Sequence, residues 1–430
     1  RGHPGTGREG PRPAGPPGVS QRFVIVGAAL TGGTAAVTLR HQGFEGSLTV
    51  IGSELHLPYE RPPLSKAFLR GEAPFEDALV RPEGFYKDSD VELRLGTTAT
   101  AVDPHAKRVT LADGEQLPYD RLLLATGARN RHFPIPGLDL EGVHSLRTVD
   151  ESEAIRKEIS PGRRAAVVGM GFIGSEVAAS LRQRGVEVTA VDGGSVPLER
   201  ILGEPVGRVL EGIHRDNGVQ LLFNDRLAAI EGHGRVERVR TAAGRTIECE
   251  FAVLGLGVEP VTELAASAGV EVDNGIVVDE RCRTNVPDIY AAGDVANHYH
   301  PVFRRRMRTE HWLNARRQGR AAALSMLNKG GAYDEVPWFW SDQYDQNLQY
   351  AGYHTEWDDI VVRGSLDRRS FVALYMSDGR VQAVAAMNRG REVTRSIGLI
   401  EAGAQGAALD PGKLRDEAVD LEDLARKTRV

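Results

Sequence analysis

Apolar positions along the chain fall into short runs separated by stretches with helical spacing, which predicts strands that alternate with helices. The clearest example begins with an apolar run at residues 165–168 and a glycine-rich turn. An amphipathic helical pattern follows as far as Arg184, and a β-branched run occupies residues 186–191. A change from strand spacing to helix spacing and back predicts a βαβ unit. Residues 23–51 repeat this alternation, so two such units are predicted.

The second unit carries glycines at the spacing that dinucleotide binding requires. Gly169, Gly171 and Gly174 form a GxGxxG motif, and Asp192 follows the second strand. In this fingerprint the first glycine makes a tight turn, the second admits the pyrophosphate and the third lets helix and strand pack. The acid binds the ribose, and the helix N-terminus offers N–H groups to the phosphates. We therefore expect this unit to bind a dinucleotide.

The first unit departs from the motif at one position, because it reads Gly27-x-Ala29-x-x-Gly32. The methyl group of Ala29 stands where the backbone should approach the pyrophosphate, and we expect a small shift of the ligand rather than lost binding. Thr31 in the same turn is a further expected contact. The end of the second strand offers two alternative ribose acceptors, Ser53 and Glu54. Two units imply two dinucleotides in one protein.

Composition bounds the class of protein. A chain of 430 residues exceeds one hydrophobic core, so two or three domains are expected. No apolar run is long enough to span a membrane, and a net charge of -6 argues against nucleic-acid binding. Cys249 and Cys282 are the only cysteines and form no metal-ligand pattern. This indicates a reducing cytoplasm, with no metal site. Residues 1–20 are rich in Pro, Gly and Arg and are predicted to be a disordered leader.

Three further motifs are more specific than the glycine turns. They are YERPPLSK at residues 59–66, AAGD at residues 291–294 and PWFWSDQY at residues 337–344. With these motifs the chain resembles the FAD-dependent NADH:ferredoxin reductases of the putidaredoxin reductase and rubredoxin reductase type, and apoptosis-inducing factor is similar around residues 59–66. The resemblance extends over residues 23–424.

This resemblance implies an α/β fold with two Rossmann-like dinucleotide-binding domains on the glutathione reductase plan and a C-terminal α+β interface domain. The FAD-binding domain is expected to be split between residues 21–126 and 257–330. The NAD-binding domain is expected at residues 127–256 and the reductase interface domain at residues 331–430.

The resemblance also implies roles for individual side chains. Arg61 and Lys66 are expected against the flavin, with Lys66 near its hydride-accepting nitrogen. Glu176 is expected to face the nicotinamide and pair with Lys66, so these two are the predicted catalytic residues. Asp294 is expected to bind the ribityl chain of FAD, and Trp312 to contact FAD through its backbone. Other implied cofactor contacts are Ala99, Ala125, Thr126, Gly127, Arg147 and Gly257.

The residues alone also allow purely structural roles. A glutamate on the first turn of a helix, as Glu176 is expected to be, stabilises the helix dipole. Asp294 is placed to cap a helix that follows it. A long helix is expected from about Glu310, where His311 is assigned a structural role. Three neighbouring aromatic residues either pack in a core or line the flavin edge: Trp338, Phe339 and Trp340.

The expected reaction follows from the cofactors and from the absent thiols. No charged side chain occupies residues 193–195, and Asp192 would repel a 2′-phosphate, so NADH is preferred to NADPH. Neither cysteine lies near the first unit, where disulfide reductases of this plan carry theirs. Electrons are therefore expected to pass from NADH through FAD, one at a time, to an iron–sulfur ferredoxin that feeds a monooxygenase or dioxygenase.

Two alternatives stay open. One is a rubredoxin, quinone or small-molecule reductase of the same fold. The other is a non-enzymatic NADH-sensing flavoprotein that resembles apoptosis-inducing factor. The basic run at residues 304–308 is either a solvated loop or a docking patch for an acidic ferredoxin; its arginines are Arg304, Arg305, Arg306 and Arg308. No nucleic-acid or membrane partner is expected.

Overall fold

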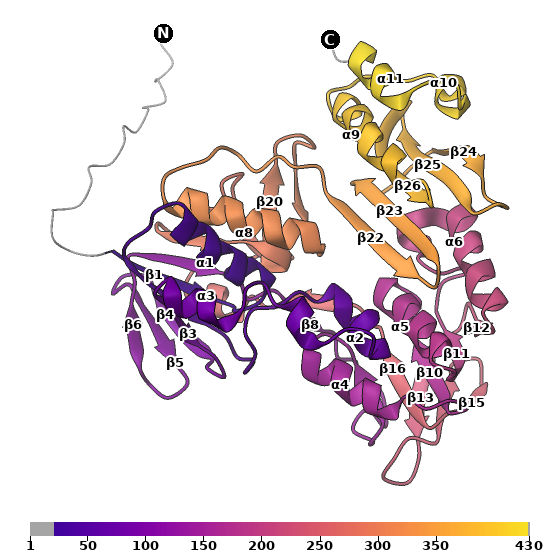
Figure 1. The fold of residues 1–430 in the computed structure, drawn as a ribbon, viewed down its shortest axis with the longest axis horizontal. Helices are drawn as coiled ribbons and strands as arrows, with labels where there is room; N and C mark the ends of the chain where they lie inside the picture. The colour runs from indigo at the N-terminus through magenta and orange to yellow at the C-terminus, as the bar shows by residue number, and fades with distance from the viewer. Residues whose placement is uncertain (1–20, 429–430) are drawn as a thin grey trace.

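Three units make up the computed structural model, which describes residues 21–428 (Figure 1). The predicted disordered leader at residues 1–20 lies outside the described residues. Two of the units are built on parallel sheets and the third on an antiparallel sheet. Within residues 21–428, no helix is both long enough and apolar enough to cross a membrane.

The first unit is organised around a five-stranded parallel sheet with the order β19-β7-β1-β2-β3. Its strands are β19 (Ile289–Ala291), β7 (Arg121–Leu124), β1 (Arg22–Val26), β2 (Ser47–Ile51) and β3 (Val91–Arg94). Parallel sheets must be covered on both faces, which is why these strands are apolar on both sides. Helices α1 (Leu30–His41) and α8 (Trp312–Met326) pack together on one face. The opposite face is covered by shorter elements: β4 (Ala99–Asp103), β5 (Arg108–Leu111), β6 (Gln116–Pro118), α7 (Glu263–Ser267) and β18 (Ile276–Val278).

The second unit repeats this plan with the strand order β12-β11-β10-β16-β9. Its strands are β12 (Gln220–Leu222), β11 (Glu187–Val191), β10 (Arg164–Val168), β16 (Phe251–Leu254) and β9 (Val143–Ser145). Helices cover one face: α2 (Ala67–Arg70), α4 (Val149–Glu158) and α5 (Phe172–Gln183). A three-stranded meander covers the other: β13 (Leu227–Glu231), β14 (Arg238–Thr241) and β15 (Thr246–Glu248). The prediction of two βαβ units is therefore confirmed.

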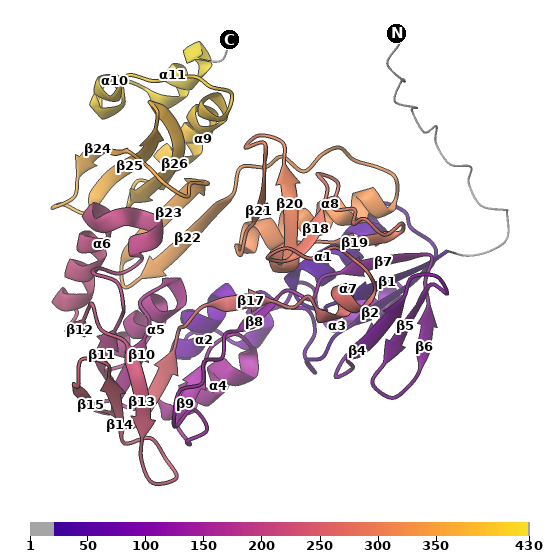
Figure 2. The ribbon, with the colours of Figure 1, turned by 180° about the vertical axis from the view of Figure 1, so that it is seen from behind.

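Two short strands carry the chain between these units. Strands β8 (Ala128–Asn130) and β17 (Val258–Pro260) pair antiparallel, so the outgoing and returning segments lie side by side (Figure 2). The hydroxyl of Thr126 adds a hydrogen bond of 2.6 Å to the carbonyl oxygen of Val261. The domain boundaries predicted next to residues 126 and 257 fall beside this ribbon and stay a prediction.

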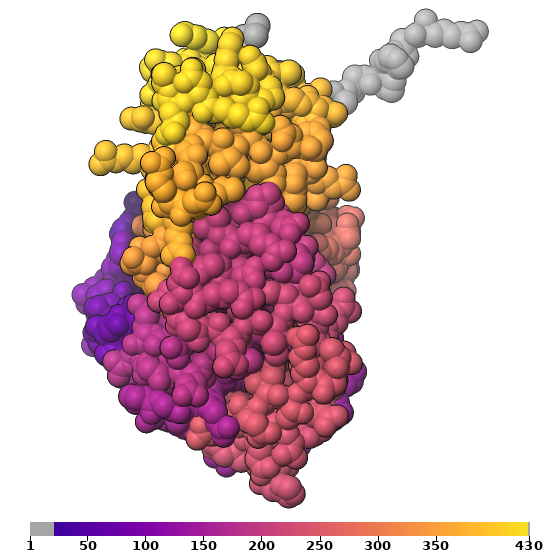
Figure 3. Space-filling view, turned by 90° about the vertical axis from the view of Figure 1, so that its right-hand side faces the viewer, coloured from indigo at the N-terminus to yellow at the C-terminus, as the bar shows by residue number. Residues whose placement is uncertain are grey.

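The third unit is an antiparallel sheet with the order β22-β23-β26-β25-β24. Its strands are β22 (Trp338–Gln343), β23 (Gln346–Gly352), β24 (Asp359–Ser365), β25 (Ser370–Ser377) and β26 (Arg380–Met387). Three helices follow: α9 (Gly390–Ala404), α10 (Pro411–Arg415) and α11 (Leu421–Thr428). They cover one face, and α6 (Glu199–Asp216) of the second unit packs against the other. Figure 3 shows this yellow and orange unit seated on the magenta surface of the second unit.

The remaining short elements form loops that border the site. A small sheet contains β20 (Ala296–His300) and β21 (Arg305–Arg308) beside β18. Between β2 and β3 lie η1 (Pro62–Ser65), η2 (Phe75–Ala78) and α3 (Glu83–Asp88). The chain turns at Asp113-Gly114 between β5 and β6 and at Asp378-Gly379 between β25 and β26, and an Asp-Gly pair is typical of such hairpin turns.

Candidate functional site

One cavity lies where all three units meet, between the first sheet, the 61–66 loop, α5, α8 and β22. Most of the predicted site residues line it, although they come from distant segments. These residues are Gly27, Ala29, Thr31, Ser53, Glu54, Arg61, Lys66, Ala125, Thr126, Gly127, Arg147, Glu176, Asp294 and Trp312. The other predicted residues lie outside its lining: Gly32, Ala99, Gly169, Gly171, Gly174, Asp192 and Gly257.

The first glycine turn is packed so closely that its two glycines are needed by the protein itself. Gly27 has a φ of 116° and donates to the carbonyl oxygen of Ile51 over 2.8 Å. A Cβ added at Gly27 would lie 2.0 Å from the carbonyl oxygen of Ala125. A Cβ added at Gly32 would lie 1.9 Å from the carbonyl oxygen of Gly27. Ala29 is the N-cap of α1 with an extended backbone, so its methyl group adds no strain. The free N–H groups of the first helical turn are left for an anion.

The second glycine turn has the same backbone but leaves one position open. Gly169 has a φ of 92° and donates to the carbonyl oxygen of Val191 over 2.8 Å. A Cβ at Gly174 would lie 1.8 Å from the Gly169 oxygen. A Cβ at Gly171 would have no described protein atom within 4 Å. The space above Gly171 is therefore available to a ligand.

The acid that ends the second unit is held by main-chain donors. The Oδ2 atom of Asp192 accepts from the Met170 N–H and Oδ1 accepts from the Gly194 N–H, each over 2.6 Å. These two bonds fix a carboxylate beside the glycine turn. The position is that of the predicted ribose acceptor, whose role remains a prediction.

Two charged side chains near this acid could not be found from the sequence. A Cβ at Gly193 would lie 3.1 Å from Nε of Arg226, which comes from the loop between β12 and β13. A Cβ at Gly194 would lie 2.8 Å from Oε2 of Glu199. Neither the spacing nor the residue type of Arg226 marks it, because only the fold brings that loop against β11.

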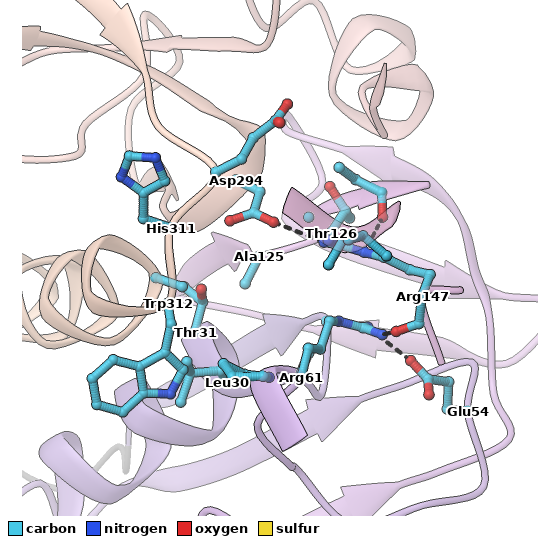
Figure 4. Close-up of a pocket in the computed structure, with 18 of the residues that line it drawn as sticks. Leu30, Thr31, Glu54, Arg61, Ala125, Thr126, Arg147, Asp294, His311 and Trp312 are labelled. Carbon is cyan, nitrogen blue, oxygen red and sulfur yellow. Dashed lines mark hydrogen bonds and ion pairs between the residues drawn. The ribbon is translucent and has the colours of Figure 1, made fainter. Parts of the chain in front are cut away.

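At the corresponding place in the first unit, Glu54 is held by side chains instead. Arg61 donates to its Oε1 over 3.0 Å (Figure 4). The Tyr59 hydroxyl donates to its Oε2. Tyr59 also accepts from the Val149 N–H over 3.1 Å. Burial raises the pKa of Tyr59 above its ordinary value, so it remains a donor. The loop that carries YERPPLSK is thus anchored to the end of β2, while the choice between Ser53 and Glu54 stays open.

A second ion pair joins the return segment to the second unit. Arg147 donates to Oδ2 of Asp294 over 2.7 Å and to the Ala128 carbonyl oxygen over 3.1 Å. The expectation that Asp294 caps a following helix is wrong. Gly293–Val295 form a single 3₁₀ turn, η3, and strand β20 comes next. The carboxylate is consequently turned toward the cavity and Arg147.

The predicted catalytic pair is formed in the structure. The Nζ atom of Lys66 donates to Oε2 of Glu176 over 2.6 Å, and both side chains are largely buried. Ser65 donates to the same oxygen over 2.5 Å. Ser341 donates to the other oxygen, Oε1, over 2.7 Å. The two serines lie within the motifs YERPPLSK and PWFWSDQY, but neither was singled out, because a serine in a motif does not indicate which group it contacts.

Aromatic side chains line part of the cavity. Trp312 and Trp340 meet edge to face with ring centroids 5.4 Å apart, and Trp338 stacks on Trp340 at 5.6 Å. Phe339 lines the cavity and also belongs to a core cluster, so both suggested roles apply to it. The long helix expected from about Glu310 is α8, which begins at Trp312. Its cap, His311, lines the cavity, and burial lowers the pKa of its ring to about 4.

Neither thiol is placed for redox chemistry. Cys249 and Cys282 are free and buried, and neither lines the cavity. Burial raises the pKa of the Cys249 thiol to about 12 and that of the Cys282 thiol still further above its usual range. Thiolates are the reactive form, so both side chains are inert packing groups.

The basic run at residues 304–308 is only partly available to a partner. Arg306 donates to the Val278 carbonyl oxygen over 2.7 Å, and Arg308 donates to the Asp294 carbonyl oxygen over 3.1 Å. Arg305 lies over the ring of Tyr353. Two of the four arginines thus support the loops around Asp294, and the docking role remains a prediction.

Comparison with known proteins gives matches over almost the whole described chain. A family model described as pyridine nucleotide-disulphide oxidoreductase matches residues 21–319, and one described as reductase C-terminal matches residues 338–425. The ferredoxin–NAD(+) reductase component of the anthranilate 1,2-dioxygenase system of Burkholderia cepacia is 42% identical over 405 residues. That alignment covers 93% of this chain and 98% of the relative.

Two more matches agree with these. Rhodocoxin reductase of Rhodococcus erythropolis is 40% identical over 401 residues, which covers 93% of each chain. The crystal structure of the covalent putidaredoxin reductase–putidaredoxin complex matches with a TM-score of 0.91 and 34% identity, over 96% of this chain and 100% of that chain. The fold class and the FAD and NAD(H) cofactors expected from the sequence are confirmed at the level of the family. The chain therefore belongs to the pyridine nucleotide-disulphide oxidoreductases, within the family of FAD-dependent ferredoxin–NAD(+) reductases.

Proposed function

We propose that this protein transfers electrons from NADH through FAD, one at a time, to an iron–sulfur ferredoxin that supplies a monooxygenase or dioxygenase. The observation that carries the proposal is a cavity in which the Lys66–Glu176 pair lies close to a glycine turn and no thiol is present. Relatives that are components of dioxygenase systems support it. We also propose a cytoplasmic location, which the two free, buried cysteines support.

The lining of the cavity fits FAD. The Gly27 turn and the N-terminus of α1 would bind the pyrophosphate, since no acidic residue occupies the first turn of that helix. Arg61, Lys66 and Arg147 provide positive charge along the cavity, and Asp294 provides an acceptor for ribityl hydroxyls. Bound FAD would supply a ring that takes two electrons as a hydride and releases them singly. The ammonium group of Lys66 would offset negative charge on that ring, as would the N-terminus of α8.

The second glycine turn would hold NADH with its nicotinamide end toward the cavity. Phe172, Ile173 and Glu176 of α5 line the cavity from this side, so one helix joins the two sites. The carboxylate of Glu176 is fixed by three donors and would orient the nicotinamide amide. No general acid or nucleophile from the protein is required.

Selectivity for NADH follows from the charges around the end of β11. Asp192 and Glu199 place two carboxylates there, and Arg226 places a guanidinium group beside Gly193. We expect NADPH to have a higher KM than NADH, because the 2′-phosphate would meet those carboxylates. Replacing Arg226 with Ala should raise the KM for NADPH more than that for NADH, as measured by steady-state dye reduction. An unchanged NADPH/NADH ratio of KM values would show that Arg226 does not contact the bound nucleotide.

The proposal is tested by cytochrome c reduction with NADH in the presence and absence of ferredoxins. We expect reduction to depend on one ferredoxin of a panel. Equal rates without any ferredoxin would instead support a quinone or small-molecule reductase. Flavin bleaching by NADH in stopped flow that is too slow for turnover would support a sensor that resembles apoptosis-inducing factor.

A docking role for the basic run is a finer part of the proposal. Arg304 and Arg305 are exposed and are not tied to main-chain carbonyls in the way Arg306 and Arg308 are. Neutralising Arg304 and Arg305 should slow ferredoxin reduction and flatten its salt dependence, while dye reduction stays unchanged. An equal loss of both activities would contradict a docking role.

A further inference from the structure

A chain of buried hydrogen bonds leads from the third unit to the catalytic pair. Ser341, Gln343 and His214 are each at most 2% exposed. The side chain of Gln343 donates to Oγ of Ser341 over 3.3 Å, and its Oε1 lies 3.0 Å from Nε2 of His214. The other ring nitrogen of His214, Nδ1, lies 3.1 Å from the Tyr344 hydroxyl. Ser341 completes the chain by donating to Glu176.

Every bond in this chain points toward the carboxylate of Glu176. Burial lowers the pKa of His214 to about 4, so its ring is neutral, and the proton must lie on Nε2 because that atom faces an amide oxygen. Burial raises the pKa of Tyr344, so its hydroxyl donates to Nδ1. Each donor is therefore also an acceptor for the next group outward. Bonds aligned in this way polarise one another and strengthen the last one, which ends on Glu176.

The chain connects three parts of the fold. His214 lies on α6 of the second unit, Ser341 and Gln343 lie on β22 of the third, and Glu176 lies on α5 beside the cavity. On β22 the residues alternate in direction, so Ser341 and Gln343 face the second unit together. Among the residues that the structure describes, Ser341 alone donates a hydrogen bond to Oε1 of Glu176, whereas Lys66 and Ser65 both donate to Oε2.

We propose that Ser341 is a positioning residue for the proposed reaction, through which the third unit fixes the orientation of Glu176 and hence of the Lys66–Glu176 pair. This inference rests on the proposed function, because Glu176 is taken to orient the nicotinamide. Without the Ser341 hydroxyl, Oε1 would lose its donor in a buried place. The carboxylate would then be free to rotate about its bond to the side chain while Lys66 and Ser65 still hold the other oxygen.

The first test replaces Ser341 with Ala in the FAD-loaded full-length protein. We expect flavin reduction by NADH in stopped flow to slow about 10-fold, which corresponds to the loss of one charge-assisted hydrogen bond. The affinity for NAD(+), titrated by tryptophan fluorescence, should fall about 5-fold by the same argument. FAD content should stay at the wild-type level, since Ser341 does not line the cavity.

The matched control is Ser396→Ala. Ser396 is also fully buried in the third unit, but its hydroxyl donates to the Glu392 carbonyl oxygen on α9, away from the cavity. Its replacement removes the same group and should change neither flavin reduction nor NAD(+) affinity. Equal effects of the two replacements would mean that Ser341 acts only through general stability, and would overturn the inference.

A double-mutant cycle with Glu176→Gln separates positioning from any independent effect. If Ser341 acts through Glu176, Ser341→Ala should change flavin reduction less than about 2-fold in the Glu176→Gln background. A further 10-fold loss in that background would overturn the inference. If the wild-type protein reduces ferredoxin and the Ser341→Ala variant is reduced by NADH at the same rate as the wild type, the inference is overturned and the proposed function stands. A wild-type protein that neither binds NAD(+) nor is reduced by NADH would overturn both.

Discussion

The two glycine turns have nearly the same backbone, yet the groups around them differ. In both, a glycine with positive φ donates over 2.8 Å to the end of the neighbouring strand, and a Cβ on the third glycine would collide with the first. The first turn faces a cavity closed by side chains from distant segments, including Arg61, Arg147 and Asp294. At the second turn, the acid is held by main-chain N–H groups and the middle glycine has open space above it.

This difference matches one resident and one exchanging nucleotide. A ligand held by charged side chains from several loops leaves slowly, because all of those contacts must open together. A ligand on a turn whose own acid is already held by the backbone can bind and leave with little rearrangement. We therefore expect the glycine turns to bind the phosphates, and the surrounding loops to determine how long each nucleotide stays bound.

The largest difference between the turns is expected from a bulky side chain at the third glycine of each. Gly32→Val should yield protein with at least about 10-fold less flavin, because the new side chain would push α1 away from β1. Gly174→Val should remain yellow but should not be reduced by NADH. The measurements are the ratio of absorbance at the flavin band to that of the protein, and stopped-flow reduction. Circular dichroism controls for folding, and a fully yellow Gly32→Val protein would contradict the assignment of the first turn.

The next effect concerns the ion pair that joins the two sites. Lys66→Met should slow flavin reduction by NADH about 100-fold, since the positive charge that we propose lies beside the flavin ring would be lost. It should also destabilise the protein by about 3 kcal/mol, because Glu176 is left buried without its counter-ion. Stopped flow and urea unfolding measure these two effects. Lys157→Met on the exposed surface of α4 is the control, and comparable losses in both variants would refute the role of Lys66.

A smaller effect is expected from exchanging the residue types at the middle position of the motif. The methyl group introduced by Gly171→Ala would have no described protein atom within 4 Å, so any effect of this substitution must act through the bound ligand. We expect the KM for NADH to rise about 5-fold with flavin content unchanged. Ala29→Gly should alter FAD affinity less than about 3-fold, since the extended backbone there suits either residue. An unchanged KM for NADH in Gly171→Ala would place the pyrophosphate elsewhere.

The smallest expected effect is a dependence of stability on pH, to which one buried histidine near each site contributes. His311 lies beside the first site and His214 behind the second, and burial lowers the pKa of each from 6.5 to about 4. Between pH 6.5 and pH 4 the unfolded chain takes up protons that the folded protein does not. As the pH is lowered from 6.5 to 4, the free energy of unfolding should therefore fall by up to about 1.4 kcal/mol per pH unit for each histidine. Above pH 6.5 these two histidines should not make the free energy of unfolding depend on pH.

Scanning calorimetry at several pH values checks this prediction. Four other histidines whose pKa values are lowered by burial act in the same direction: His144, His298, His300 and His354. A melting temperature that stays constant from pH 7 to pH 5 would show that these rings are charged in the folded protein.

Local patterns in the sequence were sufficient for the two βαβ units and for several turns. The turn at residues 113–114 and the glycine turns depend on neighbouring residues, so spacing alone locates them. The Lys66–Glu176 pair joins residues 110 apart in the chain and was expected only through the family resemblance. Ser341 lies 165 residues from Glu176, and although it belongs to the PWFWSDQY motif, the resemblance gave it no role. Contacts of this kind depend on how complete units pack, which periodicity does not contain.

The basic run shows the same limit from another side. Its positive charge was evident in the sequence, but the guanidinium groups of Arg306 and Arg308 donate hydrogen bonds to main-chain carbonyl oxygens. The error over Asp294 has a similar cause. An acid after a strand is compatible with a helix cap or with a 3₁₀ turn, and the strand pairing of β20 with β18 and β21 decides between them.

The paired strands β8 and β17 also bear on how such a chain can arise and be re-engineered. Ala128 lies opposite Pro260 and Asn130 opposite Val258, so the whole intervening segment starts and finishes at adjacent points. Removing that segment, or exchanging it with its counterpart from a relative, leaves a gap that a tight turn can bridge at little cost in chain entropy. A gene that once encoded a single nucleotide-binding fold could therefore accept a second copy in its middle without disturbing the host's strand order.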